Sequence, residues 1–193
     1  LKEKIGRHDI IVPLAAIVGA PACDRDKSLA TAVNQTQVEH IAKWATDNQI
    51  VLFPVTNSGY GIGKEGIYCN EKTPLNPISH YGETKVAGEK VLLDMGNAVT
   101  FRLATVFGSA PRMRMDLLVN DFVHRAFVDQ FIVLFESHFK RNYIHIRDIA
   151  SVFIHAIEYY GSMKGEAYNL GLSDANLSKM ELCQKIKEHL PNF

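Results

Sequence analysis

The feature that most constrains this chain is an alternation of short apolar runs with long amphipathic segments. Three runs have the length and continuity of buried strands, at 9–16, 50–55 and 98–104. Two segments between them carry apolar residues at helical spacing, 27–48 and 79–95, and the second ends at Gly96-Asn97, which is typical of a helix end. Continuous apolar strands that alternate with helices indicate β-α-β units and a parallel sheet covered on both faces.

The second half of the chain is more mixed. Helical spacing appears at 115–128, 148–160 and 178–189, and extended segments are predicted at 130–135, 142–146 and 167–170. We therefore expect the α/β class, with a doubly wound parallel sheet followed by a smaller mixed region. In such a sheet the chemistry gathers at the carboxyl ends of the strands.

Composition excludes several classes of protein. The 21 basic and 21 acidic residues cancel, so charge gives no argument for a nucleic-acid or membrane-surface partner. No apolar run is long enough to cross a bilayer, and the first residues do not form a signal peptide. Three distant cysteines and eight scattered histidines predict reduced thiols in a cytoplasmic protein without a bound metal.

A tyrosine and a lysine at helical spacing, Tyr81 and Lys85, share one face of the predicted helix 79–95. A free phenol has a pKa of about 10, and a nearby ammonium lowers that pKa by favouring the phenolate. Thr56, at the end of a predicted strand, is placed to share a substrate proton with the tyrosine. Such a set suits oxidation of an alcohol carbon while a nicotinamide takes the hydride. Because about one such Tyr-Lys pair arises by chance in every two chains of this composition, a solvated surface pair is the alternative.

The ordered context of this pair resembles the extended short-chain dehydrogenase/reductases, in particular the NAD-dependent nucleotide-sugar epimerase/dehydratase group with UDP-glucose 4-epimerase-like members. The segments that carry the resemblance follow one another along almost the whole chain: Leu14-Ala15-Ala16, Asn34, Thr56-x-x-x-Tyr60-Gly61, Pro77-x-x-x-Tyr81-x-x-x-Lys85, 102–108 and 141–148. The resemblance implies a Rossmann-type doubly wound parallel sheet, incomplete at the N-terminus. It also implies a partial dinucleotide-binding domain at 1–108 and a mostly substrate-binding mixed α/β region at 109–193, with segments returning to the main sheet.

The resemblance also implies roles for individual residues. Tyr81 would be the general base and acid, Lys85 would lower its pKa and hold the nicotinamide ribose, and Thr56 would bind the sugar hydroxyl. The implied substrate is a nucleotide-diphosphate sugar, bound by Thr56, Thr105 and Arg141. Arg112 and Arg114 are better explained as solvated surface residues. The implied cofactor is NAD, with NADP as the alternative, bound by Leu14, Ala15, Ala16, Asn34, Pro54, Val55, Tyr81, Lys85, Leu103 and Ala104.

Asn34 has an equally weighted structural alternative, a buried hydrogen bond from a helix to the backbone. The segment Gly61-x-Gly63-x-x-Gly66 spells a dinucleotide motif, but the residues after it do not predict a helix, so a glycine-rich loop is favoured. The family's true glycine-rich strand and turn are missing before Leu1, and its last substrate-domain segment is missing after Phe193. We therefore expect an internal segment of a longer enzyme.

Asn57 and Ser58 stand where the sugar dehydratases of this family carry an acidic pair, so an epimerase is favoured over a dehydratase. Two alternatives remain open: a non-catalytic fragment unable to bind cofactor, and a related reductase or decarboxylase of the same family. The resemblance further implies a homodimer formed through the helices 27–48 and 79–95.

Overall fold

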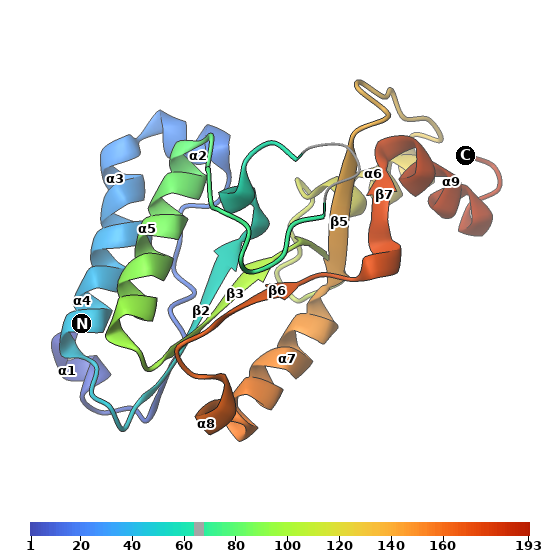
Figure 1. The fold of residues 1–193 in the computed structure, drawn as a ribbon. Coiled ribbons are helices and arrows are strands. Elements are labelled where there is room, and N and C mark those ends of the chain that lie inside the picture. Colours follow the sequence, from blue (N-terminus) through green and yellow to red (C-terminus); the bar gives the residue numbers. More distant parts are fainter. Residues whose placement is uncertain (64–67) are drawn as a thin grey trace. The chain divides into compact units, whose positions relative to one another are not determined.

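The computed structural model describes residues 1–63 and 68–193. The chain forms two compact units, Leu1–Leu103 with Phe153–Asn169, and Ala104–Val152 with Leu170–Phe193. A sheet of its own lies at the centre of each unit (Figure 1). In the described part of the chain every helix is too short or too polar to span a bilayer.

The sheet of the first unit has the strand order β1, β2, β3, β6, with bounds Ile10–Ile11, Ile50–Thr56, Ala98–Leu103 and Ala167–Leu170. β1 pairs with β2 and β2 with β3, both in parallel, and the register sets Ile10 opposite Ile50 and Val51 opposite Ala98. The predicted parallel α/β sheet is therefore confirmed. The first predicted strand is much shorter than 9–16, because β1 pairs with β2 over two residues alone.

Helices cover both faces of this sheet. α3, α4 and α5 lie on one face (Figure 1), and their bounds are Lys27–Thr31, Gln37–Trp44 and His80–Met95, with α2 at Ala20–Arg25. On the other face, Phe153 from the middle of α7 (Ile146–Glu158) packs against Phe101 of β3, with ring centroids 4.8 Å apart. The first unit also contains two short helices, α1 (Lys2–Ile5) and α8 (Tyr160–Met163), and the 3₁₀ turn η2 (Asn57–Tyr60).

The helix predicted over 27–48 forms one continuous helical segment, but it ends earlier than predicted, at Trp44. A π-helical turn, η1 (Ala32–Thr36), lies between α3 and α4. Asp26 caps the start of α3 by accepting a hydrogen bond from Leu29 N. The π-helical turn places one extra residue in the helical path near Asn34, which a fixed period of 3.6 residues does not predict.

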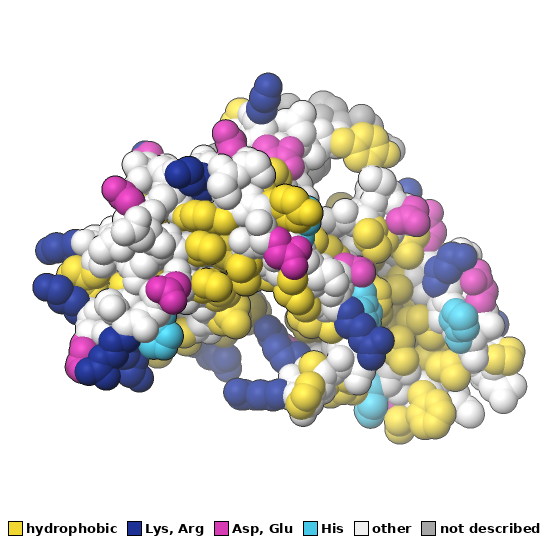
Figure 2. Space-filling model, turned by 90° about the horizontal axis from the view of Figure 1, so that it is seen from below, with side chains coloured by type: hydrophobic (Ala, Val, Ile, Leu, Met, Phe, Trp, Pro, Cys, Tyr) yellow, Lys and Arg dark blue, Asp and Glu magenta, His cyan; other side chains and the backbone are white. Residues whose placement is uncertain are grey.

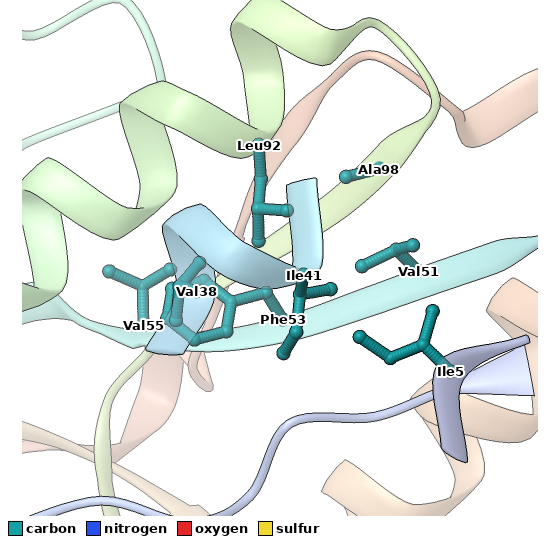
Figure 3. Packing of buried hydrophobic residues seen from close by; sticks show 8 residues of the cluster. All are labelled: Ile5, Val38, Ile41, Val51, Phe53, Val55, Leu92 and Ala98. Carbon is teal, nitrogen blue, oxygen red and sulfur yellow. The ribbon is translucent and has the colours of Figure 1, made fainter. Parts of the chain in front are cut away.

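The core of the first unit lies between the sheet and α4 and α5 (Figure 3). Its buried members come from both layers: Ile5, Val38, Ile41, Val51, Phe53, Val55, Leu92 and Ala98. Alternate residues of β2 point into this layer, since Val51, Phe53 and Val55 belong to it. The strand therefore packs against the helix pair along its length.

The second unit is mixed α/β. Its sheet has the order β4 (Thr105–Phe107), β5 (Lys140–His145), β7 (Asn176–Ser178), parallel between the first two strands and antiparallel between the last two. It is accompanied by α6 (Leu118–Val128), the 3₁₀ turn η3 (Ser173–Ala175) and α9 (Lys179–His189). A second core is formed by Val119, Phe122, Ala126, Tyr143, Leu182, Cys183 and Ile186.

The extended segment predicted at 130–135 forms no strand pair in the described structure. Its ends are turned away from a strand path by positive φ angles at Gln130 and Glu136. Phe131, Val133 and Phe135 are all at least 65% exposed. On the face shown in Figure 2, many apolar side chains lie at the surface among scattered charged ones.

Candidate active site

α5 presents Tyr81 and Lys85 on one face, one turn apart. Ser79 caps the helix by accepting a hydrogen bond from Gly82 N at 3.2 Å, and Gly96 ends it in the left-handed conformation with φ 83°. A Cβ at Gly82 would meet Pro77 Cβ at 2.9 Å, so the approach to the helix requires a glycine there. The cap fixes Tyr81, which is half-buried, in the first turn of the helix.

Lys85 is 4% exposed, which is unusual for a lysine. Its ammonium nitrogen Nζ lies over the ring of Phe53, 3.9 Å from the centroid. Burial lowers the pKa of Lys85 to about 8, and the negative charge of Glu89, one turn further along α5, opposes that shift. Burial thus disfavours the charged form of Lys85, and the carboxylate of Glu89 favours it.

Thr56 ends β2, and its hydroxyl caps the turn that follows. Its Oγ1 accepts a hydrogen bond from Ser58 N at 3.1 Å and donates one to Ser58 Oγ at 3.0 Å. Thr56 is 9% exposed, whereas Ser58 is exposed. The turn thus links the threonine hydroxyl to a second hydroxyl that reaches the surface.

Asn34 makes the buried hydrogen bonds to backbone that were the alternative to a cofactor role. Its amide accepts from Ile17 N at 2.8 Å and donates to Ile17 O at 2.9 Å, which ties the segment after β1 to the π-helical turn. It also donates to Thr84 Oγ1 of α5 at 3.3 Å. Asn34 therefore joins three elements around the Tyr81 helix.

The sequence analysis did not predict a buried ion pair between α5 and β3. Arg102 Nε of β3 donates to both carboxylate oxygens of Glu89, at 3.0 and 3.1 Å, and Thr100 Oγ1 donates to Glu89 at 2.9 Å. Arg102 Nη1 also donates to the hydroxyl of Tyr60 at 2.9 Å, and that hydroxyl donates to Asn169 Oδ1 at 2.7 Å. An arginine inside an apolar run, with a glutamate four residues after Lys85, was the available signal.

The other cofactor candidates of the first unit lie near the ends of its strands. Leu14 and Ala15, which follow β1, are exposed, and Ala16 is half-buried. Pro54 and Val55 precede Thr56, the last residue of β2, and Leu103 is the last residue of β3. A groove of about 410 Å³ runs beside β1 and is lined in part by Leu14 and Ala15, while Thr56, Tyr81 and Lys85 lie outside it.

Three predicted binding residues belong to the second unit. Ala104 is buried and Arg141 is exposed on β5, while Thr105 begins β4 and pairs with Tyr143. Of the two arginines expected on the surface, Arg114 is partly exposed and forms an ion pair with Asp116.

The glycine-rich segment after the site is only partly described. Gly61 has a φ of 76°, and neither it nor Ile62 and Gly63 is helical. The rest of the G-x-G-x-x-G segment, 64–66, lies outside the described residues. A Cβ at Gly61 would come within 2.2 Å of Asn76 O, so this glycine is required by a close approach of two loops.

Comparison with known proteins shows a family and several relatives of the chain. The sequence model of the NAD dependent epimerase/dehydratase family matches residues 1–171. The chain is 34% identical over 88 residues to the dTDP-4-dehydrorhamnose reductase of Salmonella typhimurium, covering 46% of this chain and 29% of that protein. It is 24% identical over 183 residues to the UDP-glucose 4-epimerase of Lactobacillus helveticus, covering 82% of this chain and 52% of the relative.

The fold is also found in solved structures. The UDP-glucuronic acid 4-epimerase of Bacillus cereus, solved with UDP-glucuronic acid and NAD, matches with a TM-score of 0.83 at 22% identity, over 97% of this chain and 61% of that one. The chain thus spans about half the length, or less, of the two curated relatives.

Proposed function

Because the chain belongs to the NAD dependent epimerase/dehydratase family, we propose that it carries the acid–base residues of an NAD-dependent nucleotide-sugar epimerase. The reaction would oxidise a ring carbon to a transient keto-sugar and reduce it again from the other face. One observation carries the proposal: Tyr81 and the buried Lys85 share a face of α5.

In this proposal Tyr81 takes the proton of the sugar hydroxyl and later returns it. A phenol is a weak base near neutrality, so it needs a neighbouring cation to favour the phenolate. Lys85, one turn away and desolvated, is that cation, and its charge acts more strongly in a buried site than in water. Thr56, with Ser58, supplies hydroxyls at the end of β2 that orient the substrate hydroxyl.

The residues of the first unit fit the nicotinamide end of NAD. Exposed apolar residues, Leu14 and Ala15, follow a parallel strand, and a buried ammonium, Lys85, lies on the helix that carries Tyr81. NAD, when bound, supplies the hydride acceptor and donor. Asn34 contributes by holding the segment after β1 in place through Ile17.

For the substrate we propose a nucleotide-diphosphate sugar. Arg141 is exposed on β5, and a guanidinium matches the geometry of a phosphate group. Thr105 is the second proposed contact, on the neighbouring strand of the same sheet. The solved relative that binds UDP-glucuronic acid supports this class of substrate.

The test is turnover of UDP- and dTDP-sugars with catalytic NAD by the full-length gene product, followed by separation of the sugar epimers. Tyr81→Phe should abolish turnover while the circular dichroism spectrum is unchanged. Tyr68→Phe is the matched control, because Tyr68 is 82% exposed, and it should retain activity. Full activity of Tyr81→Phe would refute the proposed role of the tyrosine.

A reductase is the second candidate, because the relative at 34% identity is a dTDP-4-dehydrorhamnose reductase. An epimerase restores its cofactor in each turnover, whereas a reductase consumes one NADH for each product formed. Stoichiometric loss of NADH absorbance with a keto-sugar would therefore favour the reductase. A dehydratase is disfavoured, since Asn57 and Ser58 provide no carboxyl group after Thr56.

We also propose a homodimer through the outer faces of α3, α4 and α5, in a reducing, cytoplasmic compartment. α4 and α5 pack side by side over the sheet (Figure 1), and Leu29 on α3 is 49% exposed. All three cysteines are unpaired in the structure, which fits a reducing environment. Light scattering should give twice the mass of the chain.

A further inference from the structure

The ammonium of Lys85 lies over the face of an aromatic ring. Nζ lies 3.9 Å from the centroid of Phe53, and the two residues are 4% and 1% exposed. Within residues 1–63 and 68–193, Nζ donates no hydrogen bond beside this contact. The face of an aromatic ring carries partial negative charge, and it attracts a cation most strongly where water is excluded.

The backbone is built for this contact. Phe53 lies in the middle of β2 and points into the layer between the sheet and the helices (Figure 3). On α5, less than one turn after Lys85, a Cβ at Gly88 would meet the Phe53 ring at 3.4 Å and Asn34 O at 3.2 Å. The missing side chain lets α5 approach the strand closely enough for the ring to lie under the lysine.

We propose that Phe53 is a positioning residue for Lys85, whose ring face holds the ammonium in place and keeps it charged in a buried site. The inference deepens the proposed function, because the charge of Lys85 is what would favour the phenolate of Tyr81. Phe53 would not touch substrate or cofactor and acts through Lys85 alone.

Other groups around Lys85 are accounted for. Glu89 on the same helix opposes the effect of burial on the pKa of Lys85. Arg102 of β3 is paired with Glu89, and Tyr60 of η2 is hydrogen-bonded to Arg102. The helices α2 and α4 also pack against α5. Burial raises the thiol pKa of Cys23 on α2, and Glu39 on α4 accepts a hydrogen bond from Gln35.

The experiment measures the titration of Lys85 directly. Protein labelled with ¹³C-lysine is titrated by NMR from pH 6 to pH 11, and the Lys85 Cε resonance is assigned by its absence in Lys85→Arg. The wild-type midpoint should lie near 8. Phe53→Leu should lower it by about one pH unit, the size expected when a desolvated cation–π contact is lost.

The matched control is Phe101→Leu. Phe101 is also fully buried in the same sheet, but it packs against Phe153 and Tyr168 rather than against Lys85. It should leave the Lys85 midpoint within about 0.2 pH unit of wild type, on the reasoning that a cation–π contact acts only at short range. If Phe53→Leu does not fold, Phe53→Met keeps the volume without the ring and should show the same shift.

An unchanged or raised midpoint in the folded Phe53 variant would overturn the proposal, and so would equal shifts in the Phe53 and Phe101 variants. The titration needs neither substrate nor cofactor. An active Tyr81→Phe variant would therefore refute the proposed function while leaving this result intact. In the active enzyme, the pH profile of kcat should move with the Lys85 midpoint, which a purely structural role of Phe53 would not produce.

Discussion

Replacing Tyr143 by phenylalanine should make the second unit more stable. Tyr143 is 2% exposed on β5, and its hydroxyl has no hydrogen-bond partner among the described residues. In the unfolded chain this hydroxyl is hydrated, so folding removes its hydrogen bonds without replacement. A buried unsatisfied polar group costs about 1–3 kcal/mol, whereas phenylalanine fills the same space in the apolar cluster and leaves no group unpaired.

We expect Tyr143→Phe to gain about 1 kcal/mol, which corresponds to roughly 2–4 °C in Tm for a chain of this size. Burial raises the pKa of Tyr143. Above pH 10 the unfolded chain therefore releases this proton more readily than the folded one, and wild-type stability falls with rising pH. The variant should lose that part of the pH dependence.

Tyr60→Phe is the control with the opposite sign. The Tyr60 hydroxyl accepts from the buried Arg102 and donates to the half-buried Asn169, so its removal takes one hydrogen bond from each of these partners. It should cost about 1–3 kcal/mol. Differential scanning calorimetry of the three proteins decides the matter. A Tm for Tyr143→Phe at or below that of wild type would refute the reasoning, since it would mean that the hydroxyl is satisfied in solution.

Two further outcomes follow from buried groups. Glu89→Gln leaves the charge of Arg102 buried without its partner, so chemical denaturation should show a loss of about 3–5 kcal/mol in the free energy of unfolding. The control Asp121→Asn breaks an exposed ion pair and should cost at most about 1 kcal/mol. Comparable losses in the two variants would contradict the argument. Thiol titration at pH 8 should find one fast group, the exposed Cys69, and two that react only after denaturation, because burial raises the pKa of both and shields them: Cys23 and Cys183. Three fast thiols would show that these cores open readily.

The local parts of the site were predictable from the sequence. Tyr81 and Lys85 are related by the helical period, and Ser79 and Gly96 mark the ends of their helix with ordinary capping residues. Thr56 follows from the end of an apolar strand. These features depend on neighbours in the chain, and so sequence patterns suffice for them.

The features that failed or were missed depend on contacts between distant segments. The π-helical turn at Asn34 lies where this side chain bonds to the distant backbone of Ile17, and the ion pair of Glu89 with Arg102 joins a helix to a strand. β4 and β7 are too short for a period-2 pattern to be recognised. The contact of Phe53 with Lys85 depends on how closely α5 approaches β2, which no local pattern reports.

The order of the main sheet has a consequence for how the chain folds. Ile10 pairs with Ile50, and Val51 pairs with Ala98, so each strand pairing closes a loop of several tens of residues. Closing such loops costs chain entropy before any pairing compensates for it, and parallel sheets accordingly form slowly. α5 makes local contacts and forms early, whereas Thr56 reaches its place only when β2 docks between its neighbours. We therefore expect refolding experiments to recover helical circular dichroism before the strand amides become protected from hydrogen exchange.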